Sequence, residues 1–223
     1  MTPAADSTAS PESIVDARFA AAARRLAGAA AVAAMIGGVL VLLGWALDIA
    51  VLKGVLAGAV TMKPNTALGF ISAGIALWLT RRTPVSPLAH RIAIVSAAVV
   101  IAVGALTLLE YAGWPINIDQ LLFPEASPAP ATIAPGRMTV ATAFNFLLIG
   151  FALLPFHRAG LERVQRRLIE VATGIALIAL AGYLYGVESF YQVGAGTRSS
   201  AMALHSSVLF VGLAAGRLCA HPD

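Results

Sequence analysis

The chain has 223 residues, of which 59% are hydrophobic and only 12% are charged, and its mean hydropathy is +0.83. A soluble domain carries about twice that share of charge, and the long apolar runs lack the alternation of a transmembrane barrel, so both classes are excluded. The composition instead predicts an all-α integral membrane protein. The net charge of +4 does not indicate nucleic acid as a partner, because the basic residues lie at the ends of apolar runs, where they set topology.

Residues 1–25 are rich in Ala, Ser, Pro and acidic residues, and we expect a flexible or weakly amphipathic cytoplasmic leader. Arginines ahead of an apolar run, here Arg24 and Arg25, are also typical of signal peptides. The run that begins at Leu26 is too long for one and the leader carries acids, which favours an uncleaved first span.

Six apolar runs predict a six-helix transmembrane domain over residues 26–219, followed by a short cytoplasmic tail at 220–223. Each run approaches the ~20 residues that cross a bilayer. The runs are Leu26–Leu47, Pro64–Leu79, Ile92–Leu109, Met138–Phe156, Leu168–Val187 and Ala201–Leu218. Pro64 suits a first helical turn, and Ser199 and Ser200 suit the cap of the last helix.

The basic residues predict the orientation. With both termini in the cytoplasm, eleven of the fifteen basic residues lie inside. The four that fall outside are Lys53, Lys63, Arg137 and Arg198. We therefore expect an N-in/C-in protein of a bacterial inner membrane. In the longest outer loop, residues 114–123 predict a short segment on the membrane interface, and the Pro-rich residues after it predict an extended strap.

A stretch of the second run recurs twice. Each copy places Met, then Thr or Ser, then Phe, then Gly or Ala at i, i+4, i+8 and i+12, which is one stripe of a helix. The copies are Met62-Thr66-Phe70-Gly74, Met138-Thr142-Phe146-Gly150 and Met202-Ser206-Phe210-Ala214. The preceding helices end in aromatic residues at Trp45, Tyr111 and Tyr183. The sequence thus predicts three repeated helical hairpins, at about 26–82, 88–158 and 164–219, in a pseudo-threefold arrangement.

The Thr/Ser, Phe and Gly/Ala positions of the stripe are small, large and small at four-residue steps. Small residues let membrane helices approach closely, so we interpret the stripe as helix packing, with a ligand-lining face as the alternative.

Seven side chains near the outer helix ends are candidates for sensing a ligand or signal: Asn65, Glu110, Tyr111, Asp119, Tyr183, Tyr185 and His205. Asn65 and His205 occupy equivalent repeat positions, and His205 is the histidine that does not lie at an expected cytoplasmic end. Polar groups at membrane depth are functional candidates by default. The alternatives are a helix cap for Asn65, a structural hydrogen bond for His205, and ordinary interface positions for the acids and tyrosines.

We expect no catalytic site, metal or cofactor. The sequence has no nucleophile paired with a base, no phosphate loop and no haem attachment motif. Its single cysteine, Cys219, is best explained as a small apolar filler.

Several short motifs resemble the N-terminal multi-span membrane region of bacterial sensor histidine kinases and diguanylate cyclases, of MASE-like type. They are Met62-Lys63-Pro64-Asn65-Thr66-Ala67-Leu68, Leu109-Glu110-Tyr111, Ile118-Asp119-Gln120-Leu121-Leu122-Phe123, Pro135-Gly136-Arg137-Met138, Gly182-Tyr183-Leu184-Tyr185-Gly186-Val187 and Met202-Ala203-Leu204-His205.

The resemblance implies a sensory input module that is not itself an enzyme, with an unidentified small ligand and a homodimer formed through a cytoplasmic output domain. No kinase or cyclase domain follows within the sequence up to Asp223, so the chain is either a fragment of such a protein or a stand-alone relative. The alternatives from the residues themselves are a small transporter or channel, and a structural subunit of a larger complex.

Overall fold

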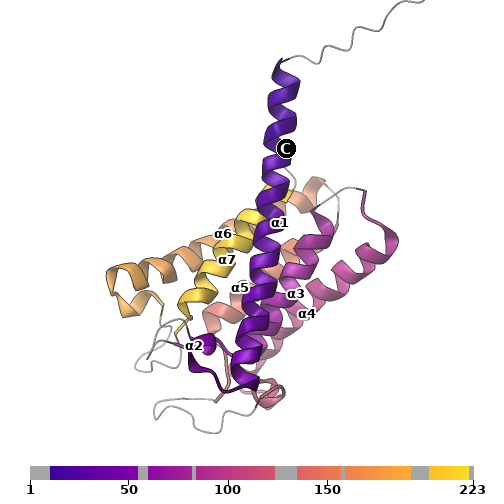
Figure 1. Ribbon diagram of the computed structural model, residues 1–223. Coiled ribbons are helices and arrows are strands. Elements are labelled where there is room, and N and C mark those ends of the chain that lie inside the picture. Colours follow the sequence, from indigo (N-terminus) through magenta and orange to yellow (C-terminus); the bar gives the residue numbers. More distant parts are fainter. Residues whose placement is uncertain are drawn as a thin grey trace, which may run out of the picture.

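The computed structural model describes residues 11–54, 60–81, 84–123, 135–156, 159–191 and 201–220, and its elements are helical, which confirms the all-α part of the predicted class. The elements are α1 (Pro11–Ala46), α2 (Ala50–Lys53), α3 (Pro64–Thr80), α4 (Pro87–Tyr111), η1 (Ile118–Gln120), α5 (Val140–Leu153), α6 (Ala159–Tyr185), η2 (Glu188–Phe190) and α7 (Leu204–Ala220) (Figure 1). Ser199, Ser200 and most of the expected strap lie outside the described residues.

α3 begins where the sequence predicts, whereas α1 begins earlier than predicted. α3 begins at Pro64, which occupies the first turn as predicted, where a missing N–H costs nothing. α1 begins at Pro11, well before the run that starts at Leu26, so the second half of the expected leader is helical.

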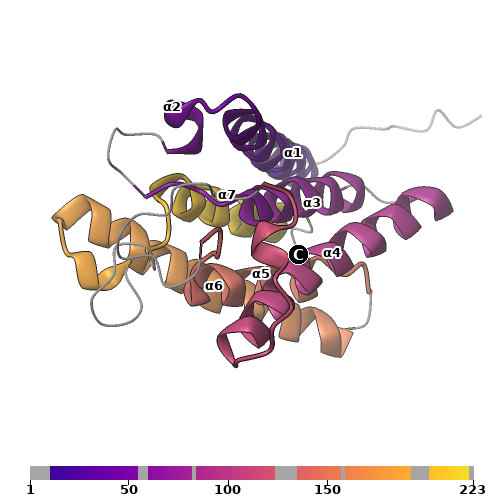
Figure 2. The same cartoon turned by 90° about the horizontal axis from the view of Figure 1, so that it is seen from below.

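Six helices form a closed ring of three hairpins. α1 packs on α3, α4 on α5 and α6 on α7, and the contacts α3–α4, α5–α6 and α7–α1 join the hairpins. The second helices of the hairpins, α3, α5 and α7, also touch one another in the centre, and α1, α4 and α6 lie around them (Figure 2). A threefold repeat of one hairpin unit produces this arrangement.

A cluster of three phenylalanines lies where the inner helices meet. Phe70, Phe146 and Phe210 are fully buried, and their ring centroids are 4.6–5.1 Å apart in all three pairs. The tilted and edge-to-face geometry is the one that aromatic quadrupoles favour. These residues are the third position of the predicted stripe, so the stripes of all three repeats face one axis. We call this cluster the Phe triad.

The aromatic residues at the ends of α1, α4 and α6 make the same hydrogen bond in each repeat. Trp45 Nε1 donates to the Met62 carbonyl at 2.9 Å, the Tyr111 hydroxyl donates to that of Met138 at 3.1 Å, and the Tyr183 hydroxyl donates to that of Met202 at 2.7 Å. Each bond satisfies a carbonyl in the extended segment that precedes an inner helix. Such irregular backbone is tolerated in a membrane domain where protein groups satisfy it.

Glycines bring the helices of the first two hairpins close together. A Cβ on Gly74 would lie 2.6 Å from the Ala31 carbonyl oxygen of α1, and one on Gly150 would lie 2.6 Å from the Ile101 side chain of α4. The third repeat has Ala214 at this position. Packing of small residues is the usual means of helix association in lipid.

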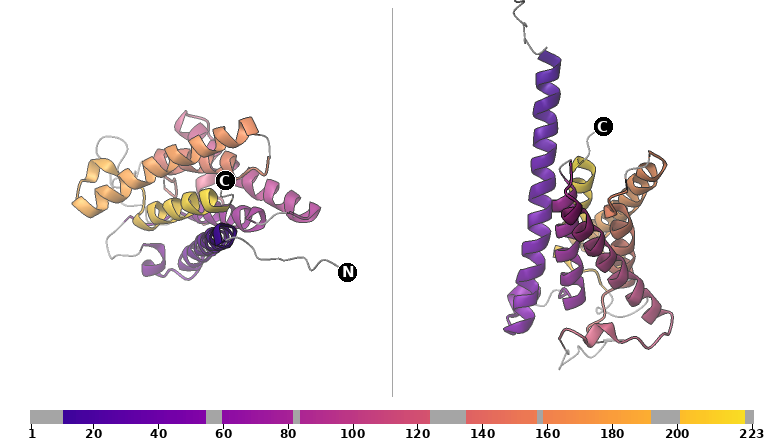
Figure 3. Two further views of the ribbon diagram at one scale, coloured as in Figure 1. Left: turned by 90° about the horizontal axis from the view of Figure 1, so that it is seen from above. Right: turned by 90° about the vertical axis from the view of Figure 1, so that its right-hand side faces the viewer.

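Three of the described helices are long and apolar enough to cross a bilayer: Asp16–Ala46, Pro87–Tyr111 and Gly160–Tyr185. They are the outer helices α1, α4 and α6, and they expose large apolar side chains such as Leu40, Val95 and Ile178. Apolar surface of this extent is typical of membrane contact. The start of α1 and the end of α7 lie at the same end of the bundle (Figure 3).

Candidate functional site

The polar side chains of interest gather where the inner helices begin. We call this the pocket end of the bundle, and the opposite end, where α1 starts and α7 finishes, the terminal end.

A buried ion-pair cluster joins four segments at the pocket end. Arg137 Nε lies 2.6 Å from Asp119 Oδ2 and 3.5 Å from Glu110 Oε2. The Glu110 and Asp119 side chains are 0% and 4% exposed, and that of Arg137 is 19% exposed. Asn65 Nδ2 donates to the other Asp119 oxygen at 3.2 Å. We call these residues, Asn65, Glu110, Asp119 and Arg137, the Arg137 cluster.

The backbone around the cluster holds its carboxylates in place. Glu110 ends α4, and its Oε1 accepts a hydrogen bond from the Ile118 N–H at 2.7 Å, which fixes the start of η1. Asn117 adopts a left-handed conformation (φ +59°) to turn the chain into η1. Gly136 has φ +76°, and a Cβ there would lie 2.5 Å from the Asp119 carbonyl oxygen, so this position requires glycine.

Tyr111 contacts both the Arg137 cluster and the segment that precedes α5. Its hydroxyl binds the Met138 carbonyl, and the Arg137 guanidinium carbon lies 5.3 Å from the centroid of its ring. A cation at this distance from an aromatic face is attracted by the ring quadrupole. Four of the seven predicted sensing candidates, Asn65, Glu110, Tyr111 and Asp119, are therefore brought together around one arginine.

The other three candidates lie apart from the cluster. The Tyr183 hydroxyl is taken by Met202, and its ring stacks on Tyr191 with centroids 4.1 Å apart. The side chain of Tyr185 is 75% exposed. His205 is half-buried in the first turn of α7, and within the described residues neither ring nitrogen has a hydrogen-bond partner. The candidates thus form an ion-pair cluster and a separate group on the third repeat.

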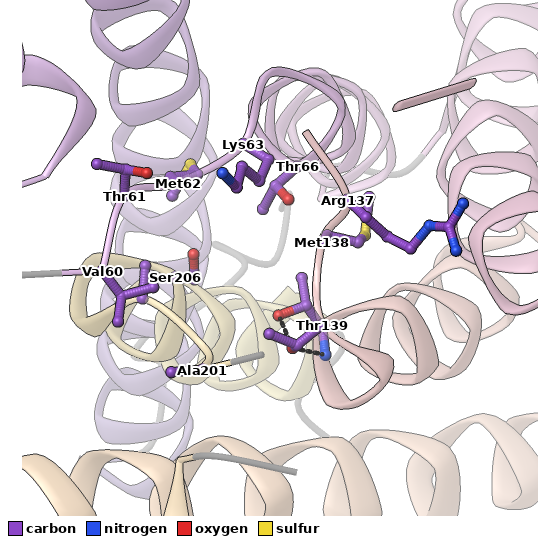
Figure 4. A pocket seen from close by; sticks show the side chains of 12 residues that line it. Val60, Thr61, Met62, Lys63, Thr66, Arg137, Met138, Thr139, Ala201 and Ser206 are labelled. Carbon is purple, nitrogen blue, oxygen red and sulfur yellow. Dashed lines mark hydrogen bonds between the residues drawn. The ribbon is translucent and has the colours of Figure 1, made fainter. Parts of the chain in front are cut away.

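A small pocket of about 20 Å³ opens among the starts of the three inner helices (Figure 4). Its lining includes the same stripe position of every repeat, Thr66, Thr142 and Ser206, together with Lys63 and Arg137. The Phe triad follows these hydroxyl positions by four residues, which is about one helical turn deeper on each helix. The pocket therefore lies on the pseudo-threefold axis, and the Phe triad lies deeper along it.

Sequence reasoning missed two features of this end. It assigned Arg137 only to topology, although a lone basic residue just before a stripe methionine, in a loop that also carries Asp119, is a signal for pairing. It favoured packing for the Thr and Ser positions and kept a ligand-lining face only as the alternative, because periodicity does not show whether three stripes meet tightly or leave a space.

Outside the membrane-spanning segments, Asp48 follows α1 and forms an exposed ion pair with Lys53. The hydrogen bond and charge of the Lys53 ammonium lower the pKa of the Asp48 carboxyl below its ordinary value. No group of three or more His, Cys, Asp or Glu side chains able to hold a metal ion occurs among the described residues.

Comparisons with known proteins return no family model, no curated protein and no solved structure that matches this chain.

Proposed function

We propose that the chain is a six-span sensory input module of a bacterial signalling protein, with both termini in the cytoplasm. A stimulus is read at the pocket end, and a displacement of α7 carries the signal to the terminal end. The proposal rests on the resemblance of the sequence to membrane regions of sensor kinases and cyclases, and on the path that α7 takes through the bundle.

The path of α7 is the observation that carries the proposal. α7 contributes Ser206 to the pocket and Phe210 to the Phe triad. At the terminal end, Arg217 donates to the Ala152 carbonyl of α5 at 2.8 Å and to the Gln165 side chain of α6 at 3.1 Å. One helix thus contacts both the polar end and the end at which an output domain would follow.

A transporter or channel is the alternative, and the Phe triad argues against it. The rings close the axis of the bundle beneath the pocket, and the deeper stripe positions are the small residues Gly74, Gly150 and Ala214. Uptake of small ions and solutes into proteoliposomes would support this alternative directly.

A reporter chimera tests the sensory role. The chain is joined after Ala220 to the cytoplasmic region of a histidine kinase with a transcriptional reporter. We expect Glu110→Gln and His205→Ala each to shift reporter output several-fold at equal membrane abundance. Val171→Ala is the control, since Val171 is 50% exposed on the outer face of α6. Output unchanged by both substitutions would contradict the proposed site.

A further inference from the structure

The pocket on the pseudo-threefold axis carries hydrogen-bond donors that the fold does not use. Thr66, Thr142 and Ser206 line it and are 2%, 3% and 1% exposed. Within the described residues, the hydroxyls of Thr66 and Ser206 make no hydrogen bond. A buried hydroxyl without a partner costs free energy, so a ligand that bonds to it gains affinity.

Thr142 can also donate a hydrogen bond into the pocket. The Thr139 hydroxyl accepts from the Thr142 N–H at 3.1 Å and donates to the Thr142 hydroxyl at 2.9 Å. The Thr142 oxygen therefore already accepts one hydrogen bond, and its own O–H remains for the pocket. Three hydroxyl donors from three helices thus line one space.

The electrostatic field in the pocket favours negative charge. α3, α5 and α7 have 17, 14 and 17 residues, and all three begin at the pocket, so the positive ends of their dipoles meet there. The charged side chains among the lining residues, Lys63 and Arg137, are both basic. The charge of Arg137 is offset by its ion pairs with Asp119 and Glu110, which lie outside the lining, so the helix dipoles are the main attraction for an anion.

A cation does not suit this space, because its lining contains basic side chains and no carboxylate. The size of the space, about 20 Å³, also excludes a bulky anion. We propose that the pocket is a binding site for a compact, singly charged anion, either a halide or the head of a single carboxylate.

Binding here is a property of the folded bundle, so it is tested without a signalling readout. A failure to bind anions would not affect the reporter result. A reporter that does not respond would not affect the binding result. The full chain is purified in detergent at constant ionic strength with methanesulfonate, which has no carboxylate and is too bulky for the pocket. Chloride, bromide or formate then replaces methanesulfonate stepwise while the midpoint of thermal unfolding is recorded.

We expect a saturable rise in the midpoint with one of these probes. A preference for the halides or for formate identifies the source of the negative charge. Thr66→Val and Ser206→Ala should each weaken the apparent affinity about ten-fold, because each removes one hydrogen bond to a charged ligand. Thr107→Val is the matched control, since its hydroxyl is also buried and unpartnered among the described residues but lies outside the pocket lining.

Lys63→Gln provides a second variant at the pocket rim if a hydroxyl variant does not fold, and it should also weaken binding by about ten-fold. An unfolding midpoint that does not respond to any probe, or the same anion dependence in the wild type, the hydroxyl variants and Lys63→Gln, would overturn the proposal.

Discussion

Two buried asparagines of the inner helices show how differently polar side chains are used in this bundle. Asn65 donates to Asp119 at 3.2 Å and accepts from the Thr66 N–H at 2.9 Å. Asn145 is fully buried, yet among the described residues neither its amide nitrogen nor its oxygen has a partner. The first side chain joins the candidate site, and the second is an unfavourable group that the surrounding packing must offset.

The same substitution at both positions separates these roles. Asn65→Ala should lower the free energy of unfolding by about 2 kcal/mol, because it removes a hydrogen bond to a buried carboxylate. Asn145→Ala should leave stability within about 1 kcal/mol of the wild type or raise it, because it removes unpaired polar atoms. Unfolding of the purified protein in mixed detergent micelles measures both. An equally large loss at Asn145 would show that its amide is paired in the folded protein.

Two ion pairs with the same separation of 2.6 Å allow a comparison of burial. Arg137 faces carboxylates that are almost fully buried, whereas the Arg167–Glu170 pair on α6 is exposed. Arg137→Gln should cost about 3 kcal/mol or more, since it leaves buried charges without compensation. Arg167→Gln should cost less than about 1 kcal/mol.

A double variant checks the cause of that loss. Adding Glu110→Gln to Arg137→Gln removes one of the uncompensated charges, so it should recover part of the lost stability. Losses that simply add would contradict a direct interaction between Glu110 and Arg137.

At the residue scale, the sequence predicted the acids better than their partner. Glu110 and Asp119 stood out because carboxylates near apolar spans are rare. Arg137 did not, because topology alone already explains a basic residue at a helix end. Which loop folds over which helix decides the pairing, and spacing along the chain does not contain that information.

At the scale of elements, the helix contacts depend on glycines whose environments differ. Gly74 and Gly150 lie against the backbone or side chains of a neighbouring helix, whereas a Cβ on Gly174 of α6 would meet nothing within 4 Å. The stripe pattern predicted Gly74 and Gly150 as packing positions. It could not predict how close the helices come, which depends on the facing residues Ala31 and Ile101.

Alanine substitutions test this difference. Gly74→Ala and Gly150→Ala should each lower the free energy of unfolding by roughly 1–3 kcal/mol, because the added methyl group pushes two helices apart. Gly174→Ala should raise it by up to about 1 kcal/mol, since alanine is the better helix former and has room. The measurement is again unfolding in mixed micelles. Equal effects at the three positions would mean that propensity, and not close packing, governs them.

At the scale of the whole molecule, the outer helices α1, α4 and α6 are longer than the inner helices α3, α5 and α7. α1, with 36 residues, is about 54 Å long and projects beyond the other helices at the terminal end (Figure 3). The inner helices, with 14–17 residues, are about 21–26 Å long, which is less than the ~30 Å of a hydrocarbon core. In the proposed six-span topology, the extended segments before the inner helices would have to complete their crossings.

The proposed topology, with six crossings and both termini inside, would place the pocket end in the periplasm, and cysteine labelling tests this. In a Cys219→Ala background, Leu121→Cys introduces a thiol at a 79% exposed position of the pocket end. Gly160→Cys introduces one at an exposed position near the start of α6, at the terminal end. We expect a membrane-impermeant maleimide to label position 121 in cells with a permeabilised outer membrane, and position 160 only after the inner membrane is opened.

The two positions are informative together because α5, the helix between them in the chain, must cross the membrane for them to lie on opposite sides. Labelling of both from the outside would contradict the hairpin topology. The reverse pattern would keep the six spans but turn the pocket towards the cytoplasm. The pocket would then face the cytoplasm and the chain ends would face the periplasm. A stimulus from outside the cell could not reach the pocket directly.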